Sequence, residues 1–210
     1  MLFAVKNPLY YYEKYRENKF DRVFGTDTSR IVPVDQFTVS TPNLVYALHY
    51  EAITQRFFYR MIKAVPVKYN DFVFIDLGSG KGRALMLASA YPFKKIIGVE
   101  FSPELHTIAK SNVKSIIEKK QIPDNFELHC MDAESFDFPK ENIVLFLYNP
   151  FHGKVMLSIV NKINVFIEKC PFQMTIMYRN PKCADLLDKQ DFLKLIKATP
   201  HYRVYTGIRR

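Results

Sequence analysis

The strongest constraint on the fold is a short stretch at residues 72–83, which reads FVFIDLGSGKGR. An apolar run rich in β-forming residues ends at Asp76. Three glycines follow at alternate positions, and an apolar helical run occupies residues 84–90. Glycine has no Cβ and tolerates positive φ, so such a turn lets a ligand lie against bare backbone. The stretch predicts a strand, a tight turn and a helix, the unit of an open α/β sheet that binds ligands at its strand ends.

The pattern after residue 71 alternates between strands and helices. Two helices with apolar stripes are expected, one beginning after Ser102 and one over residues 153–169. Strands are expected at residues 72–76, 95–100, 125–130, 143–148 and 173–178. Alternating elements of this kind predict a parallel sheet with helices on both faces.

The end of the chain breaks this alternation. Residues 191–198 and 201–208 read as two strands joined by a link too short for a parallel crossover, so they must be antiparallel. The predicted fold class is therefore α/β: a doubly wound, mostly parallel seven-stranded sheet with an antiparallel terminal hairpin. Residues 71–210 form this domain. Residues 1–70, which are aromatic and irregular with one or two helices before Pro66, are predicted to form an N-terminal cap or lid.

Composition narrows the function classes. The chain has 210 residues, a net charge of +9 and three widely spaced cysteines, Cys130, Cys170 and Cys183. That cysteine pattern fits neither a disulfide framework nor a zinc site, so a cytoplasmic protein without a metal is expected. No apolar run approaches the roughly 20 residues of a membrane span, so no membrane partner is expected. The positive charge permits a nucleic-acid partner, although it is spread along the chain.

Three classes of ligand compete for the glycine turn. A P-loop needs G-x-x-x-x-G-K-[ST], whereas here Lys81 is followed by Gly82. A dinucleotide site needs G-x-G-x-x-G, whereas the spacing here is G-x-G-x-G. Asp76 stands two residues before the first glycine, where a carboxylate repels a pyrophosphate and suits a cation. S-adenosylmethionine (SAM) is cationic and carries no phosphate, so it fits best.

Two further acids support SAM as the ligand. Glu100 ends the next predicted strand, where one carboxylate can accept hydrogen bonds from two ribose hydroxyls. Asp132 follows the third strand, where a polar side chain can meet the edge of an adenine. Each acid alone is also a common helix cap, but the three occur in the order and at the positions that the fold requires.

The segment Asp76-Leu-Gly-Ser-Gly-Lys-Gly resembles motif I of the class I SAM-dependent methyltransferases, and the resemblance extends over about residues 72–208. It implies SAM as cofactor, S-adenosylhomocysteine (SAH) as product and no metal. It also implies that residues matching the family's site bind the cofactor: Asp76, Gly78, Ser79, Gly80, Glu100, Phe101, Asp132, Ala133 and Asn149.

Two narrower resemblances add candidates. The glycine block, the segment IGVEFSPEL at residues 97–105 and the segment LFLYNPF at residues 145–151 resemble a bacterial family of class I methyltransferases of unassigned substrate. The glycine block and the following Gly-x-Glu also resemble the histone-lysine methyltransferases that lack a SET domain, in which a Tyr-Gly-Glu loop covers the cofactor. Tyr50 and Glu51 stand at a similar distance before motif I, without the glycine, and the resemblance implies the same role for them.

The chemistry is expected at the end of the fourth strand, where the chain reads Tyr148-Asn149-Pro150-Phe151. This segment resembles the (Asp/Asn/Ser)-Pro-Pro-(Tyr/Phe) motif of amino-group methyltransferases, one proline short. Asn149, with Pro150 and Phe151, is predicted to orient the lone pair of an acceptor nitrogen. The predicted acceptor is a protein lysine or another amine. A nucleic-acid methyltransferase and a SAM-binding protein without catalysis remain alternatives. Lys81 and Arg83 are expected to point outward from the helix start or to meet the cofactor's carboxylate.

Overall fold

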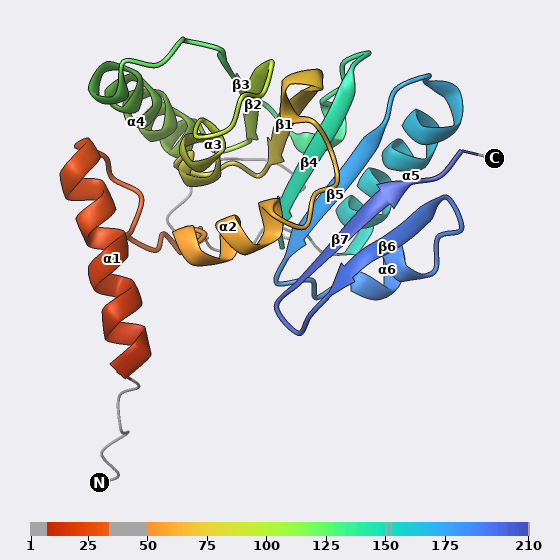
Figure 1. Cartoon of the computed structure of the whole chain (residues 1–210), viewed down its shortest axis with the longest axis horizontal. Coiled ribbons are helices and arrows are strands. Elements are labelled where there is room, and N and C mark those ends of the chain that lie inside the picture. Colours follow the sequence, from red (N-terminus) through yellow and green to blue (C-terminus); the bar gives the residue numbers. More distant parts are fainter. Residues whose placement is uncertain (1–7, 34–49, 150, 152, 210) are drawn as a thin grey trace, which may run out of the picture.

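The computed structural model describes residues 8–33, 50–149, 151 and 153–209, and its centre is one seven-stranded sheet (Figure 1). The strands are β1 (Phe72–Leu77), β2 (Lys95–Glu100), β3 (Phe126–Cys130), β4 (Asn142–Tyr148), β5 (Met174–Arg179), β6 (Leu193–Ala198) and β7 (Tyr202–Gly207). Their order is β3-β2-β1-β4-β5-β7-β6. The first five strands are parallel, and β7 runs antiparallel to both of its neighbours, β5 and β6. The predicted fold class is confirmed.

Strand β1 lies at the point where the direction of winding reverses. Its neighbour on one side is β2 and on the other is β4, so the chain crosses from one half of the sheet to the other here. The register pairs Asp76 with Gly98 of β2 and with Phe146 of β4. The carboxyl ends of these three strands therefore meet at one edge of the sheet, where doubly wound folds leave a crevice for a ligand.

Helices cover both faces of the sheet. Their bounds are α1 (Pro8–Phe24), α2 (Gln55–Ile62), α3 (Arg83–Ala88), α4 (Pro103–Lys120), α5 (Gly153–Lys169) and α6 (Ala184–Asp188), with the 3-10 turns η3 (Tyr69–Asp71) and η4 (Ala133–Ser135). Alternate residues of a strand point to opposite faces. Accordingly Val73 and Ile75 belong to the core under α5 and α6, whereas Phe72 and Phe74 pack with α2 and α3. Within the described ranges, no helix is long and apolar enough to cross a membrane.

The expectation of irregular structure near the N-terminus is wrong for residues 8–24, which form α1. The helix leans on α4 and α3, away from the sheet (Figure 1). Among the α1 side chains that the structure describes, Phe20 is buried and packs with Met86 and Ile116. Helix α2, expected before Pro66, begins after the cap residue Thr54, whose side chain accepts from the N–H of Phe57. Residues 34–49, which precede α2, lie outside the described residues.

Candidate functional site

The glycine turn folds back against β2. The carbonyl of Val99 accepts hydrogen bonds from the N–H groups of Gly78 (2.9 Å) and Ser79 (3.0 Å). Gly80 takes a left-handed backbone with φ of 53°. A Cβ at this position would lie 2.2 Å from the ring of Tyr50, so no larger residue fits without displacing that ring. The turn therefore lies at the carboxyl end of β1 and lines the first cavity, with the ring of Tyr50 packed on Gly80.

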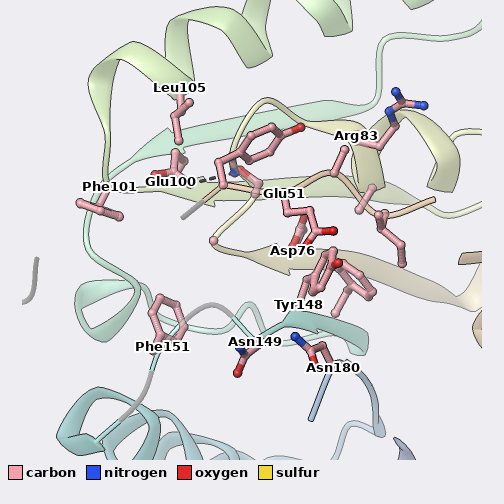
Figure 2. Close-up of a pocket in the computed structure, with 18 of the residues that line it drawn as sticks. Glu51, Asp76, Arg83, Glu100, Phe101, Leu105, Tyr148, Asn149, Phe151 and Asn180 are labelled. Carbon is pink, nitrogen blue, oxygen red and sulfur yellow. Dashed lines mark hydrogen bonds between the residues drawn. The ribbon is translucent and has the colours of Figure 1, made fainter. Parts of the chain in front are cut away.

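Two buried carboxyl groups face the cavity beside this turn (Figure 2). Glu100 accepts from the N–H of Gly80 (2.8 Å) through one oxygen and from the N–H of Ser102 (2.9 Å) through the other. Burial raises the pKa of Glu100 to about 7. Asp76 is 2% exposed, and within the described residues its Oδ1 has no hydrogen-bond partner. Burial, with the neighbouring charge of Glu100, raises the pKa of Asp76 well above its usual range.

The first cavity encloses about 890 Å³, including space open to solvent. Ten of the residues predicted from sequence line it: Tyr50, Glu51, Asp76, Gly78, Ser79, Gly80, Glu100, Phe101, Asn149 and Phe151. A second cavity of about 340 Å³ shares Gly78, Phe101 and Phe151 with the first and is also lined by the two remaining described candidates, Asp132 and Ala133. Asp132 caps η4, because its side chain accepts from the N–H of Glu134. Pro150 lies outside the described residues.

The N-terminal segment supplies one wall of the first cavity. Tyr50 forms an isolated antiparallel bridge with Val32, and its hydroxyl donates to the carbonyl of Thr28 (2.9 Å). Glu51 follows and is hydrogen-bonded to the phenol of Tyr148. Burial, followed by the charge of Glu51, raises the pKa of that phenol, so Tyr148 stays protonated. The two sequence candidates on the N-terminal side are thus brought to the glycine turn from far along the chain.

The opposite wall comes from the ends of β4 and β5 (Figure 2). Asn149 is 7% exposed and has φ of 41°, and Asn180 has φ of 49°. Within the described residues only Gln121 joins them as a non-glycine residue with positive φ. Unusual backbone conformations at pocket-lining residues are common at functional sites. Asn180, Tyr148 and Lys182 line the cavity but were not predicted, although the position of Asn180 directly after a parallel strand was a usable signal.

The expectation that Lys81 and Arg83 point outward is wrong. Lys81 is fully buried and its Nζ pairs with Asp27 (2.9 Å). Arg83 is 1% exposed and donates to Glu17 (2.7 Å) and to the hydroxyl of Thr28 (2.6 Å). Both side chains point into the N-terminal segment, because the carboxylates of Asp27 and Glu17 lie there and offset the cost of burying the two cations.

Comparison with known proteins fits this geometry. Residues 74–159 match a family model described as a methyltransferase domain. A precorrin-6y C5,15-methyltransferase of Geobacter metallireducens shares the fold at 14% identity and a TM-score of 0.52, over 85% of this chain and 100% of that one. A SAM-dependent O-methyltransferase of Thermotoga maritima shares the fold at 16% identity and a TM-score of 0.52, over 75% of this chain and 66% of that one. An rRNA methylase of Streptococcus thermophilus shares the fold at 15% identity and a TM-score of 0.50, over 72% of this chain and 95% of that one. No curated protein sequence matches the chain.

The fold and the site together define the class I methyltransferase architecture. The family match over residues 74–159 includes the glycine turn, Glu100, Asp132 and Asn149. Residues 74–159 of the chain therefore match a methyltransferase domain, and the chain has the fold of the class I methyltransferases.

The residues present suit SAM. A buried carboxylate oxygen without a partner, as at Asp76, favours a ligand that brings a cation or a donor. The turn lines the cavity with backbone, and Glu100, which accepts from the backbone N–H groups of Gly80, Ser102 and Phe101, keeps acceptor capacity for a hydroxyl donor.

The raised pKa of Glu100 predicts a pH-dependent stability. The folded protein holds the proton more tightly than the unfolded chain, so the contribution of Glu100 is present at low pH and is lost as the pH rises from about 4.5 through about 7. The loss amounts to as much as about 3 kcal/mol, since one pKa unit corresponds to about 1.4 kcal/mol. We expect urea unfolding at pH 5 to 8 to show a shallower decline in Glu100→Gln than in the wild type. Equal slopes would contradict the assignment.

Proposed function

We propose that this protein transfers a methyl group from SAM to a nitrogen atom, and that the acceptor is a protein lysine or another amine. SAM supplies an electrophilic methyl group on a sulfonium. The protein's task is then to bind the cofactor, to direct a nitrogen lone pair at that carbon and to keep water away. The observation that carries the proposal is Asn149, a buried amide in the cavity wall with a left-handed backbone at the end of β4.

Cofactor binding is assigned to the two cavities beside the glycine turn. Asp76 would hold the cationic amino group, because its Oδ1 is buried without a partner in the described structure. Glu100 would accept from the ribose hydroxyls. Asp132 and Ala133 line the second, mostly apolar cavity, which suits the adenine. Tyr50 and Glu51 would close the site from the N-terminal side.

Acceptor binding is assigned to the wall made by β4 and β5. The side-chain oxygen of Asn149 can accept an N–H of the substrate and so turn its lone pair toward the methyl group. Phe151, which is 7% exposed, borders both cavities. Glu51 lines the same cavity and can accept a second N–H of the neutral amine.

A nucleic-acid acceptor is the second candidate, and a basic groove favours it. Arg16 of α1 with Arg56 and Arg60 of α2 line a cavity of about 850 Å³ together with Tyr59 and Tyr91. Cations and aromatic rings of this kind suit phosphates and stacked bases.

The two candidates are separated by labelling. Incubation with methyl-labelled SAM should label protein or small-amine pools and leave RNA and DNA unlabelled. Binding to RNA should stay weak and change little between 50 and 200 mM salt. Label in nucleic acid, with affinity falling roughly tenfold or more over that range through counterion release, would contradict the amine proposal.

A further inference from the structure

Two charged side chains, one within the glycine turn and one just after it, anchor the N-terminal segment. Lys81 donates to both carboxylate oxygens of Asp27, at 2.9 and 3.0 Å. Arg83 reaches Glu17 in α1 at 2.7 Å, and its guanidinium lies 4.0 Å from the centre of the Phe20 ring. Both cations are buried, so each depends on these partners to offset its desolvation.

Asp21 organises the loop that follows α1. Its carboxylate accepts from the hydroxyls of Thr26 (2.7 Å) and Thr28 (2.6 Å) and from the N–H groups of Thr28 (3.0 Å) and Ser29 (2.7 Å). Four bonds to one carboxylate fix the backbone of residues 26–29 in one conformation. Asn112 of α4 also fixes this loop. Its side-chain oxygen accepts from the N–H of Asp27, and its side-chain nitrogen donates to the carbonyl of Asp27.

Thr28 links this loop to the cofactor site. Its side chain is fully buried, and its hydroxyl accepts from Nε of Arg83 (2.6 Å) while it donates to Asp21. Its carbonyl accepts from the hydroxyl of Tyr50 (2.9 Å), and the ring of Tyr50 lies against Gly80. A continuous connection therefore runs from Asp21 and Arg83 through Thr28 and Tyr50 to the turn.

We propose that Asp21, Thr28 and Arg83 are positioning residues that set the ring of Tyr50 against the glycine turn and thereby shape the cofactor pocket. The proposal rests on the proposed function in so far as that pocket binds SAM. The proposal gives Asp21 and Thr28, which lie outside the family match at residues 74–159, a role in cofactor binding.

The test compares Thr28→Val with Thr28→Ser by calorimetric titration of SAH. Valine keeps the shape but removes the hydroxyl, so SAH should bind about tenfold more weakly, the usual effect of one lost buried hydrogen bond to a charged group. Serine keeps the hydroxyl and should bind within about threefold of the wild type. A role in packing alone predicts the reverse, since serine loses a buried methyl group and valine does not.

A second pair of variants tests the route through Tyr50. Tyr50→Phe removes the hydroxyl that bonds to Thr28 and should also weaken SAH binding about tenfold; it serves alone if Thr28→Val does not fold. In the double variant the losses should not multiply, because both break one connection. The matched control is Tyr205→Phe, which loses a partly buried hydrogen bond to Asp188 away from the cavities and should leave SAH affinity unchanged.

The outcomes separate the two proposals. A wild type that binds no SAH would overturn the proposed function and this inference together. A wild type that binds SAH, with Thr28→Val and Tyr50→Phe both within about twofold of it, would overturn this inference alone. Equal losses in Thr28→Val and Thr28→Ser would do the same.

Discussion

Replacement of Gly80 by alanine is expected to weaken SAH binding roughly 100-fold. The left-handed backbone at Gly80 costs an alanine about 1–2 kcal/mol. The new Cβ would also lie 2.2 Å from Cδ2 and 2.4 Å from Cε2 of Tyr50. That ring is held by Thr28 and cannot simply rotate away, so either the turn or the N-terminal wall must move. Calorimetric titration of SAH measures the loss directly.

Gly82→Ala is the matched control for this variant. Gly82 belongs to the same turn and has φ of 82°, so alanine there meets a similar backbone penalty. Its nearest neighbour would be Cβ of Ala109 at 3.4 Å, an ordinary contact. We expect lower thermal stability but SAH affinity within about threefold of the wild type, since Gly82 does not line either cavity. Similar losses of affinity in the two variants would show that backbone strain, and not Tyr50, determines the effect.

Replacement of Asn149 is expected to reduce methyl transfer about 100-fold while SAH affinity changes less than about threefold. The variant loses the side chain that directs the acceptor nitrogen. Removal of one positioned hydrogen-bonding group from an active site usually lowers the rate by about this factor. Because Asn149 has a left-handed backbone, Asn149→Ala adds strain, whereas Asn149→Gly removes the amide without it. Single-turnover transfer of labelled methyl to the pool that the wild type modifies is the measurement.

Two further variants sharpen this test. Asn149→Asp keeps an acceptor oxygen and should retain more activity than the alanine or glycine variants. Asn125→Ala loses an amide that donates to the carbonyl of Phe93 at the opposite edge of the sheet, and should transfer methyl groups normally. Full activity in Asn149→Gly would rule out the orienting role of this residue.

The sheet and the candidates on its edge could be predicted because their signals are local. A run of apolar residues, a strand-terminal acid and a glycine turn follow one another in the sequence, and parallel strands bring their ends together. Asp76, Glu100, Asp132 and Asn149 were all found in this way, and the structure places them at the two cavities. Asn180 obeys the same rule, since it directly follows the parallel strand β5, but no acid or glycine beside it marks the position in the sequence.

The N-terminal half of the site could not be predicted in the same way. Helix α1 is held by Phe20 in a cluster with Met86 and Ile116 and by the ion pair of Glu17 with Arg83, contacts more than 60 residues apart. Such long-range pairs leave no periodic signal, and a run of tyrosines beside turn-forming residues reads as irregular. Lys81 and Arg83 were expected at the surface for the same reason, since the acids that bury them lie far upstream.

Titration of the wild-type protein with SAH and, separately, with NAD+ tests the central claim most directly, because both ligands suit a glycine turn after a parallel strand but only SAH lacks a pyrophosphate. We expect SAH to bind with one-to-one stoichiometry at micromolar or lower Kd, to compete with SAM and to bind at least about tenfold more weakly to Glu100→Ala. NAD+ should give no saturable heat. Binding of NAD+ in place of SAH, or SAH affinity unchanged in Glu100→Ala, would contradict the assignment of this site.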